Sequence, residues 1–229
     1  MIKIGILSAL GREIKEVINN IDITNSLEIK GYRFTEGHYN GLKIVVGTTS
    51  VGKVNAALCT EILINNFNPT TIINTGIAGS LSPKVKVLDI VISNSINFYD
   101  IDDYILKGCF PFKETFPIDL NLIEIAEKIS LSEAEKAKVH FGKIISGDSF
   151  IASQIEKDKL VSLYNPLCVE MEGAAIAHVC YINKIPFISF RGISDPADDS
   201  ARKFYKENEK LAANRTGKIV VKFLDAYNY

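Results

Sequence analysis

Short β-branched runs alternate with segments of helical periodicity along most of this chain. Strands that alternate with helices predict a mostly parallel sheet between two helix layers, so the expected fold class is a three-layer α/β/α domain. We expect one domain over residues 1–229. The expected strands are Ile2–Ser8, Thr71–Asn74, Asp89–Ser93, Val139–Ser146 and Pro186–Gly192. The expected helices are Glu13–Ile18, Lys53–Phe67, Leu120–Ile129, Gln154–Leu163, Gly173–Ile182 and Arg202–Leu224.

Two segments depart from this alternation. Leu27–His38 and Leu42–Thr48 flank Tyr39-Asn40-Gly41, and Asn-Gly between β-rich runs predicts an antiparallel hairpin, because both residues tolerate positive φ. Asn97–Pro117 carries glycine and prolines with little periodicity. It predicts a long loop, and loops of this length in compact domains are usually functional or mobile.

Composition excludes several classes of partner. The 26 basic and 27 acidic side chains leave a net charge of −1, so nothing attracts nucleic acid or an anionic membrane surface globally. No apolar run reaches the roughly 20 residues that a membrane helix needs, and the amino terminus lacks a signal-peptide pattern. The 4 cysteines form no C-x-x-C pair, which indicates neither zinc nor a disulfide framework and favours a reducing cytoplasm.

Polar and glycine-rich residues collect where the predicted strands end. In open α/β sheets, ligands bind at the carboxyl ends of strands, so these segments are candidates for one site. Gly76 and Gly79 alone would more often mark a turn than a ligand contact. The segments are Ser8–Glu13, Thr75–Ser80, Ser146–Ile151, Val169–Gly173 and Arg191–Asp195.

The acids in these segments differ in how readily a structural role explains them. Glu13 could be a first-turn acid favoured by the helix dipole, and Asp195 a cap or turn residue. Glu170 and Glu172 precede an otherwise small and apolar helix, where an unpaired carboxylate is costly. We therefore expect one of these two glutamates to contact a ligand.

Other catalytic patterns are missing from the sequence. The three histidines are scattered and are expected to be structural, and Ser149 lacks the G-x-S-x-G context of a nucleophile elbow. Neither a Walker loop nor a dinucleotide fingerprint is present, so no nucleotide cofactor is indicated.

Taken together, the motifs closely resemble the 5′-methylthioadenosine/S-adenosylhomocysteine nucleosidases of the nucleoside phosphorylase superfamily. They match in order and at compatible spacing over nearly the entire chain. The matching segments are Lys3–Glu13, Ser50–Val54, Asn74–Gly79, Ser146–Ile151, Val169–Ala174 and Arg191–Asp195.

The resemblance implies an enzyme that hydrolyses the N-glycosidic bond of adenine nucleosides with a 5′-thioether and releases adenine. It implies no metal or cofactor, and it extends to 5′-deoxyadenosine or 6-amino-deoxyfutalosine as possible substrates. By the same resemblance, Asp195 would protonate adenine N7 and Glu13 would activate water. Glu172 would hold the ribose hydroxyls, Phe150 would stack on the purine, and the Ile151 backbone would read its edge. The remaining implied substrate-binding residues are Ala78, Gly79, Met171, Arg191 and Ser194.

Two carboxyl groups on opposite sides of the sugar suit this reaction. The leaving base must be neutralised by a proton while water arrives on the other face, as in inverting glycosidases. Burial should raise the pKa of the donor Asp195, while a cation such as Arg191 should keep the base Glu13 ionised.

Two positions depart from the family pattern. Ile77 stands where many members have Ser, and Tyr99–Leu106 replaces a histidine-containing segment. In the family, this segment reaches across a homodimer to cover the 5′ substituent. We therefore expect a homodimer with Asn97–Pro117 near the partner's site. Because this segment is altered, the resemblance does not identify the preferred 5′ group.

Two alternative functions remain at this point. A purine nucleoside phosphorylase would use phosphate instead of water, but Glu13 would repel that anion and Ile77 offers no hydroxyl; Arg12 could favour it. A non-catalytic nucleoside-binding module would keep the pocket without turnover, although Glu13, Glu172 and Asp195 are all intact.

Overall fold

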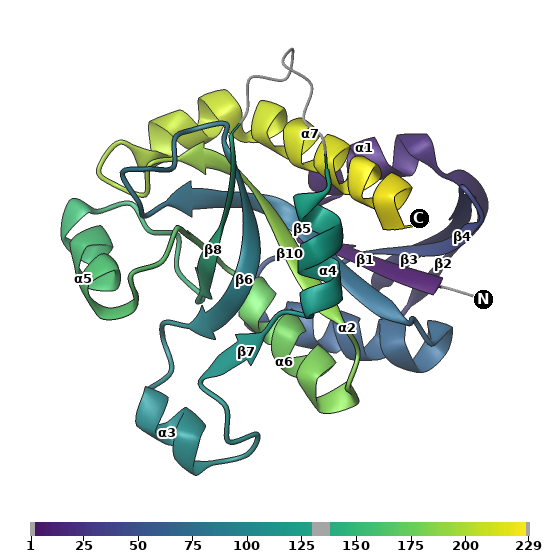
Figure 1. Cartoon of the computed structure of the whole chain (residues 1–229), viewed down its shortest axis with the longest axis horizontal. Helices are drawn as coiled ribbons and strands as arrows, with labels where there is room; N and C mark the ends of the chain where they lie inside the picture. The colour runs from purple at the N-terminus through teal and green to yellow at the C-terminus, as the bar shows by residue number, and fades with distance from the viewer. Residues whose placement is uncertain (1–2, 130–137, 228–229) are drawn as a thin grey trace.

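The computed structural model describes residues 3–129 and 138–227 (Figure 1). Ile2, expected to begin the first strand, lies outside the described residues. The strands are β1 (Lys3–Ser8), β2 (Asp22–Ile29), β3 (Tyr32–Tyr39), β4 (Leu42–Thr48), β5 (Thr71–Ser80), β6 (Ile90–Phe98), β7 (Thr115–Pro117), β8 (Val139–Ser146), β9 (Cys168–Glu170) and β10 (Phe187–Asp195). The helices are α1 (Gly11–Asn20), α2 (Lys53–Phe67), α3 (Asp103–Gly108), α4 (Leu120–Glu127), α5 (Gln154–Tyr164), α6 (Gly173–Asn183) and α7 (Ala201–Tyr227).

The strands form one mixed sheet of ten strands. Its centre, β4–β1–β5–β10, is parallel throughout. Beyond β10 the sheet continues through β6, β8 and β9, and β9 pairs with β5, so these five strands close on themselves. The mostly parallel character expected from the sequence holds for the centre, whereas β2, β3, β7 and β9 each make an antiparallel pairing and β6 pairs antiparallel with β10.

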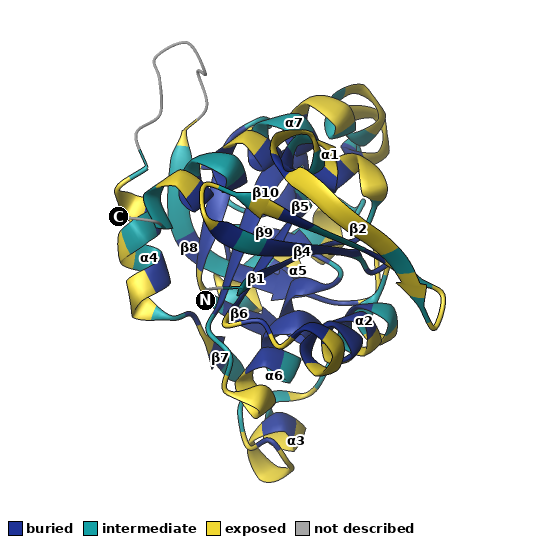
Figure 2. Ribbon diagram, turned by 90° about the vertical axis from the view of Figure 1, so that its right-hand side faces the viewer, coloured by how far each residue is buried: buried dark blue, intermediate teal, exposed yellow. Residues whose placement is uncertain are grey.

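Helices cover both faces of the sheet, which confirms the three-layer α/β/α arrangement (Figure 2). Helices α1 and α7 pack against each other on one face, and α2 and α6 pack against each other on the opposite face. Strands β5 and β10 lie between the layers, and nearly all their residues are buried. Their apolar residues, such as Ile72 and Ile188, form the core.

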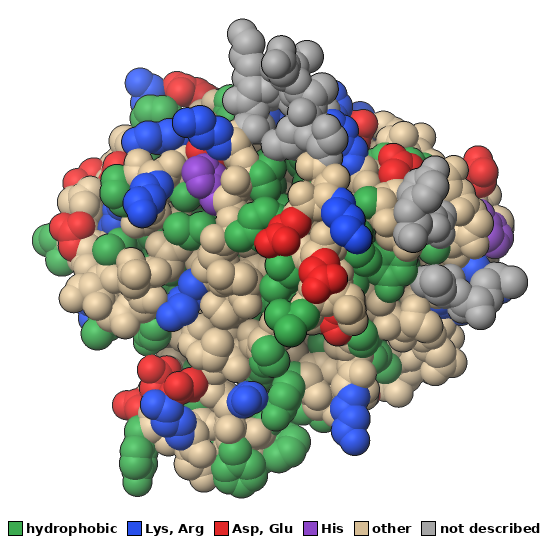
Figure 3. All heavy atoms as spheres, in the orientation of Figure 1, with side chains coloured by type: hydrophobic (Ala, Val, Ile, Leu, Met, Phe, Trp, Pro, Cys, Tyr) green, Lys and Arg blue, Asp and Glu red, His purple; other side chains and the backbone are tan. Residues whose placement is uncertain are grey.

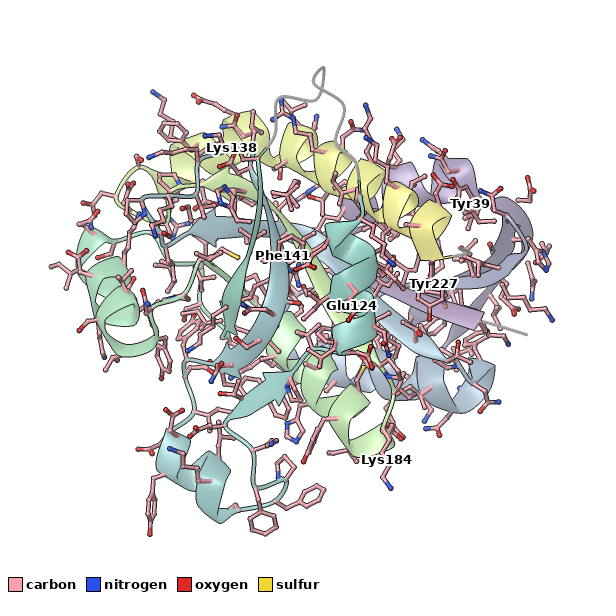
Figure 4. All side chains as sticks on the ribbon, viewed as in Figure 1. Tyr39, Glu124, Lys138, Phe141, Lys184 and Tyr227 are labelled. Carbon is pink, nitrogen blue, oxygen red and sulfur yellow. The ribbon has the colours of Figure 1, made fainter. Side chains whose placement is uncertain are left out.

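Helix α7 runs along the sheet from its carboxyl edge to its amino edge. Gly192 on β10 allows this close approach, because a Cβ there would collide with Thr216 and the Ala212 carbonyl of α7. At the far end, the Tyr227 and Thr71 hydroxyls are 2.7 Å apart, and Figure 4 labels Tyr227 on the last turn of α7. Among the helices of the described ranges, including α7, none is long and apolar enough to span a membrane.

Most expected elements are present, but one predicted strand is divided in two and several strands extend beyond their predicted ends. The run predicted as one strand over Leu27–His38 is two strands, β2 and β3, joined at Lys30-Gly31, where both residues have positive φ. The strands expected at Thr71–Asn74 and Pro186–Gly192 both extend further, into the glycine-rich segments that follow them. These extensions carry site residues on the sheet itself.

The prediction of a long loop over Asn97–Pro117 is wrong. The segment continues β6, then forms α3 and β7, which pairs with β6. Asp102 caps α3 by accepting a hydrogen bond from the Tyr104 N–H at 2.8 Å. With 6 residues in α3 and 3 in β7, both elements are too short to produce a periodic pattern.

Candidate active site

A pocket lies at the carboxyl edge of the sheet, where all five predicted segments meet. Ser8–Glu13 supplies one wall, and the end of β5 and the end of β10 supply the floor. The lining residues are Ala9, Leu10, Glu13, Val51, Ile77, Ala78, Gly79, Ser149, Phe150, Ile151, Val169, Glu170, Met171, Glu172, Ser194, Asp195 and Tyr205. This set contains every site residue predicted from the sequence except Arg191.

Glu13 lies at the start of α1 and is 4% exposed. Its Oε2 accepts the Leu10 N–H at 2.8 Å, and its Oε1 accepts the Ile77 N–H at 3.4 Å. Glu13 therefore accepts a hydrogen bond at the start of α1, which fits the structural role of a first-turn acid, and it also faces the pocket. Burial raises its pKa, and Arg191 and the two N–H groups only partly offset that rise. Arg191 lowers the pKa of Glu13, in the expected direction, but burial raises that pKa by more, so the net shift is opposite to the one expected for a base kept ionised.

Arg191 lies behind the pocket wall and is 1% exposed. Its Nη2 donates to Glu170 Oε2 at 2.5 Å and to the Asn74 side-chain oxygen. Gly76 permits this placement, since a Cβ there would collide with the guanidinium and come within 3.3 Å of Glu13 Oε1. The guanidinium therefore influences Glu13 through space, while its own hydrogen bonds are directed to other residues.

Glu170 and Glu172 take different roles. Glu170 accepts hydrogen bonds from the Ser146 hydroxyl and from the N–H groups of Glu172 and Gly173, besides its ion pair with Arg191. Glu172 Oε1 accepts the Gly52 N–H at 2.9 Å, and within the described residues its Oε2 has no hydrogen-bond partner. Of the two, Glu172 therefore has a carboxyl oxygen available to a ligand.

The helix after these two acids begins at Gly173, as expected, whereas the short strand β9, which Glu170 ends, was not predicted. Burial, reinforced by the nearby Glu170 carboxylate, raises the pKa of Glu172 to about 8. Burial therefore favours the protonated form of this carboxyl group.

Asp195 ends β10 and is 2% exposed. Its Oδ2 accepts the Ser194 hydroxyl at 2.7 Å, and its Oδ1 accepts the Ala197 N–H at 3.0 Å. Burial raises the pKa of Asp195, and these hydrogen bonds oppose the rise. The direction agrees with what a proton donor requires. Ser194 thus orients Asp195 directly.

Phe150 and Tyr205 form the outer wall. Their rings meet edge to face with centroids 5.5 Å apart. The Tyr205 hydroxyl accepts a hydrogen bond from Arg12 Nη2 at 2.7 Å, and Arg12 also pairs with Glu209 at 3.0 Å. Sequence reasoning missed Tyr205, because it lies within a long amphipathic helix and no local motif marks it.

The charged side chains of the lining are all acids. Glu13, Glu170, Glu172 and Asp195 line the pocket, and the lining set includes neither lysine nor arginine among the described residues. Across residues 3–129 and 138–227, no group of three His, Cys, Asp or Glu side chains is arranged to hold a metal ion. The arrangement can donate a proton at one side of a bound molecule and accept one at another.

Comparison with known proteins agrees with this geometry. The family model described as the phosphorylase superfamily matches residues 3–225. A 5′-methylthioadenosine/S-adenosylhomocysteine nucleosidase from Maridesulfovibrio salexigens is 31% identical over 228 residues, covering 97% of this chain and 98% of that protein. The chain therefore belongs to the phosphorylase superfamily and, within it, to the 5′-methylthioadenosine/S-adenosylhomocysteine nucleosidases.

Solved structures superpose closely. The nucleosidase from Colwellia psychrerythraea 34H, solved in complex with adenine, has a TM-score of 0.93 at 31% identity, covering 98% of this chain and 95% of that one. The futalosine hydrolase of Helicobacter pylori strain 26695 has a TM-score of 0.90 at 29% identity, covering 98% and 97%. Proteins with this fold thus include more than one nucleoside hydrolase.

The raised pKa of Glu172 predicts how stability depends on pH. Native Glu172 keeps its proton up to about pH 8, whereas the unfolded chain releases it near 4.5, so in between the native state binds more protons. The free energy of unfolding should therefore fall as pH rises through that window, and Glu13 and Asp195 contribute in the same direction.

Glu172→Gln should show a smaller fall in the free energy of unfolding than wild type, measured by urea denaturation at several pH values across that window. Glu28→Gln, at an exposed position on β2, is the control and should follow wild type. An identical pH dependence in Glu172→Gln and wild type would contradict the assignment.

Proposed function

We propose that this chain hydrolyses the N-glycosidic bond of 5′-methylthioadenosine and S-adenosylhomocysteine and releases adenine. The observation that carries the proposal is the pocket lined by Glu13, Glu172 and Asp195 beside an aromatic wall. The named activity of the nucleosidase relatives supports the substrate class. We further propose that the protein is a single-domain enzyme and that it acts in methionine salvage in a reducing cytoplasm.

Asp195 is the proton donor in this scheme. In this scheme adenine would stack on Phe150 and pair with the Ile151 backbone, with N7 toward the Asp195 carboxyl, and all three residues line the pocket. The donated proton goes to N7 as the C1′–N9 bond breaks and its electron pair goes to the base. Because burial raises the pKa of Asp195, the proton is more available at working pH than on an ordinary aspartic acid.

Glu13 takes the proton of the incoming water. Water adds to C1′ of the oxocarbenium-like sugar and gives up one proton to the Glu13 carboxylate, forming a free ribose that keeps its 5-thioether group. Arg191 and the N–H groups of Leu10 and Ile77 stabilise that carboxylate against its burial. Exchange with solvent then returns Glu13 and Asp195 to their starting states.

Glu172 and Met171 hold the sugar between these two groups. The unshared Glu172 oxygen accepts from a ribose hydroxyl or, while protonated, donates to it. Two hydroxyls on one sugar can engage both oxygens of a carboxyl group, which fixes the rotation of C1′ relative to Glu13 and Asp195.

Phosphorolysis is the less suitable alternative for this pocket. A phosphate site requires cations and hydroxyl or N–H donors, and an incoming anion here would meet carboxyl groups instead. Arg12, the residue that could have supplied the cation, donates to Tyr205 and pairs with Glu209 on α7. Water is therefore the favoured nucleophile.

The 5′ side of the pocket admits related substrates. Its remaining wall is formed by Ala9, Leu10, Val51 and Tyr205, which are mostly apolar and suit a thioether. 5′-Deoxyadenosine and 6-amino-deoxyfutalosine use the same base and ribose contacts, and the resemblance to a futalosine hydrolase supports including the latter. In our proposal, the altered Tyr99–Leu106 segment determines which of these 5′ groups the enzyme prefers.

The proposal includes a homodimer. Val54 and Leu58 on α2 are 71% and 52% exposed. The segment that follows α3 adds two exposed aromatic side chains, Phe110 and Phe112. Figure 3 shows hydrophobic side chains gathered at the end of the molecule where α3 lies. Exposed apolar patches of this kind mark protein interfaces, and here the second copy would bring Asn97–Pro117 near the partner's pocket.

A substrate panel in phosphate-free buffer tests the activity. We expect base release from methylthioadenosine and adenosylhomocysteine without added phosphate, and at least ~10-fold slower release from methylthioinosine, whose 6-oxo group leaves a buried polar group unpaired. Adenosine and inosine complete the panel, followed by chromatography of the free bases. A requirement for phosphate, with a ribose 1-phosphate product, would make the protein a phosphorylase.

Glu13→Gln and Asp195→Asn should each lower kcat by at least ~10², because each removes one proton-transfer partner while keeping the shape of the side chain. Nucleoside binding should persist better in Glu13→Gln. Steady-state kinetics with isothermal titration of a nucleoside separates the two effects. Wild-type turnover in either variant would show that the acid and base are assigned to the wrong residues.

Val54→Asp combined with Leu58→Asp should convert the proposed dimer to monomer, because it introduces charge into the apolar surface of α2. Sedimentation velocity gives the mass of each species. The single change Glu124→Lys, on the surface of α4, is the control and should leave the mass unchanged (Figure 4). A wild-type monomer would refute this part of the proposal.

A further inference from the structure

The segment that carries the base-stacking residue has no secondary structure of its own. Residues 147–153, here called the base loop, connect β8 to α5 and include Phe150 and Ile151. Stacking and edge recognition require this loop to keep a fixed distance from the ribose acid Glu172. Contacts from other parts of the chain must supply that constraint.

Two consecutive N–H groups at the start of α2 bind Glu172 and the base loop. The Gly52 N–H donates to Glu172 Oε1 at 2.9 Å, and the next N–H, of Lys53, donates to Asp148 Oδ1 at 2.8 Å. Asp148 is the second residue of the base loop. Consecutive peptide groups therefore bind the ribose acid and the base loop, and the rigid peptide geometry sets the spacing between them.

The Lys53 side chain completes a closed set of contacts. Its Nζ lies 2.7 Å from Asp100 Oδ1 and 3.7 Å from Asp148 Oδ2. Asp100 Oδ2 in turn accepts the Asp148 N–H at 2.9 Å. Each of the three residues thus contacts the other two, although they come from α2, the segment after β6 and the base loop.

The segment after β6 also contacts the base loop at a second point. The Tyr99 hydroxyl donates to the Ser149 carbonyl at 3.0 Å, next to Phe150. Lys53 and Asp100 are only 18% and 28% exposed in their side chains, so solvent screens their attraction less than it screens a fully exposed pair. The base loop is therefore held from one side by both polar and ionic contacts.

We infer that Lys53 and Asp100 are positioning residues, which fix the base loop relative to Glu172 through Asp148 and the start of α2. Neither residue lines the pocket, so neither contacts the substrate. The inference rests on the proposed function, because it assigns the base loop to adenine recognition. It identifies Lys53 as the more sensitive position, since its loss leaves two neighbouring carboxylates, Asp100 and Asp148, without their shared cation.

Lys53→Met and Asp100→Asn test this inference. We expect the dissociation constant of adenine and the KM for methylthioadenosine to rise by about 10-fold in Lys53→Met and by less in Asp100→Asn, with a smaller change in kcat. Lys53→Arg should recover part of the loss, since it restores a cation near both acids. His140→Gln is the matched control, because it alters a comparably buried contact: His140 Nε2, on the amino-terminal half of β8, lies 2.9 Å from Asp89 Oδ2.

A structural role would give a different result. Loss of folded protein lowers the number of active sites and kcat together, and leaves KM and the adenine dissociation constant of the remaining sites unchanged. Wild-type adenine affinity in folded Lys53→Met, or an equal loss in His140→Gln, would overturn the inference. If Lys53→Met does not fold, the milder Asp100→Asn variant decides by the same criteria.

Adenine binding, measured by calorimetry, needs no turnover. If wild type binds adenine but cleaves no nucleoside, the proposed function fails while the positioning role is still decided by the variants. If wild type cleaves nucleosides and the variants bind adenine normally, the proposed function stands and the positioning role fails.

Discussion

A buried ion pair between Arg191 and Glu170 organises the pocket. The two side chains are 1% and 2% exposed and lie 2.5 Å apart. Removing such charges from water costs several kcal/mol per ion, so the pair persists only because further hydrogen bonds satisfy it. Ser146 and the Gly173 N–H bind Glu170, while Asn74 binds Arg191. The pair thereby joins β5, β8, β9 and β10 at the edge where ligands enter.

The acids that face the ligand depend on this pair. Glu172 follows Glu170 by two residues, and its N–H is held by the Glu170 carboxylate at 3.0 Å. Glu13 lies next to the Arg191 guanidinium across Gly76, whose missing side chain leaves the space between them open. Truncating one partner would leave an uncompensated buried charge, which costs about 3–5 kcal/mol in typical proteins. The functional carboxyl groups therefore depend on a buried ion pair in which the Glu170 carboxylate is well hydrogen-bonded, whereas Arg191 Nε has no partner among the described residues.

The sequence predicts the carboxyl groups that face the ligand better than it predicts the residues that position the pocket around them. Glu13, Glu172 and Asp195 are visible because they follow strand-like runs or precede an apolar helix, and strand ends converge in an α/β sheet. Tyr205 and the Lys53–Asp100 pair are brought to the site by tertiary packing between segments far apart in the chain, which no local pattern encodes. The same limit applies to α3, where one capping aspartate competes with glycine and proline signals.

Three carboxyl groups with raised pKa values lie in one pocket. A nucleoside that displaces water and forms new hydrogen bonds there changes the preference of each carboxyl for its proton. Association is then accompanied by exchange of protons with the buffer, in an amount that varies with pH. The heat of nucleoside binding consequently includes the ionisation heat of the buffer, and two buffers at one pH give different apparent enthalpies for the same complex.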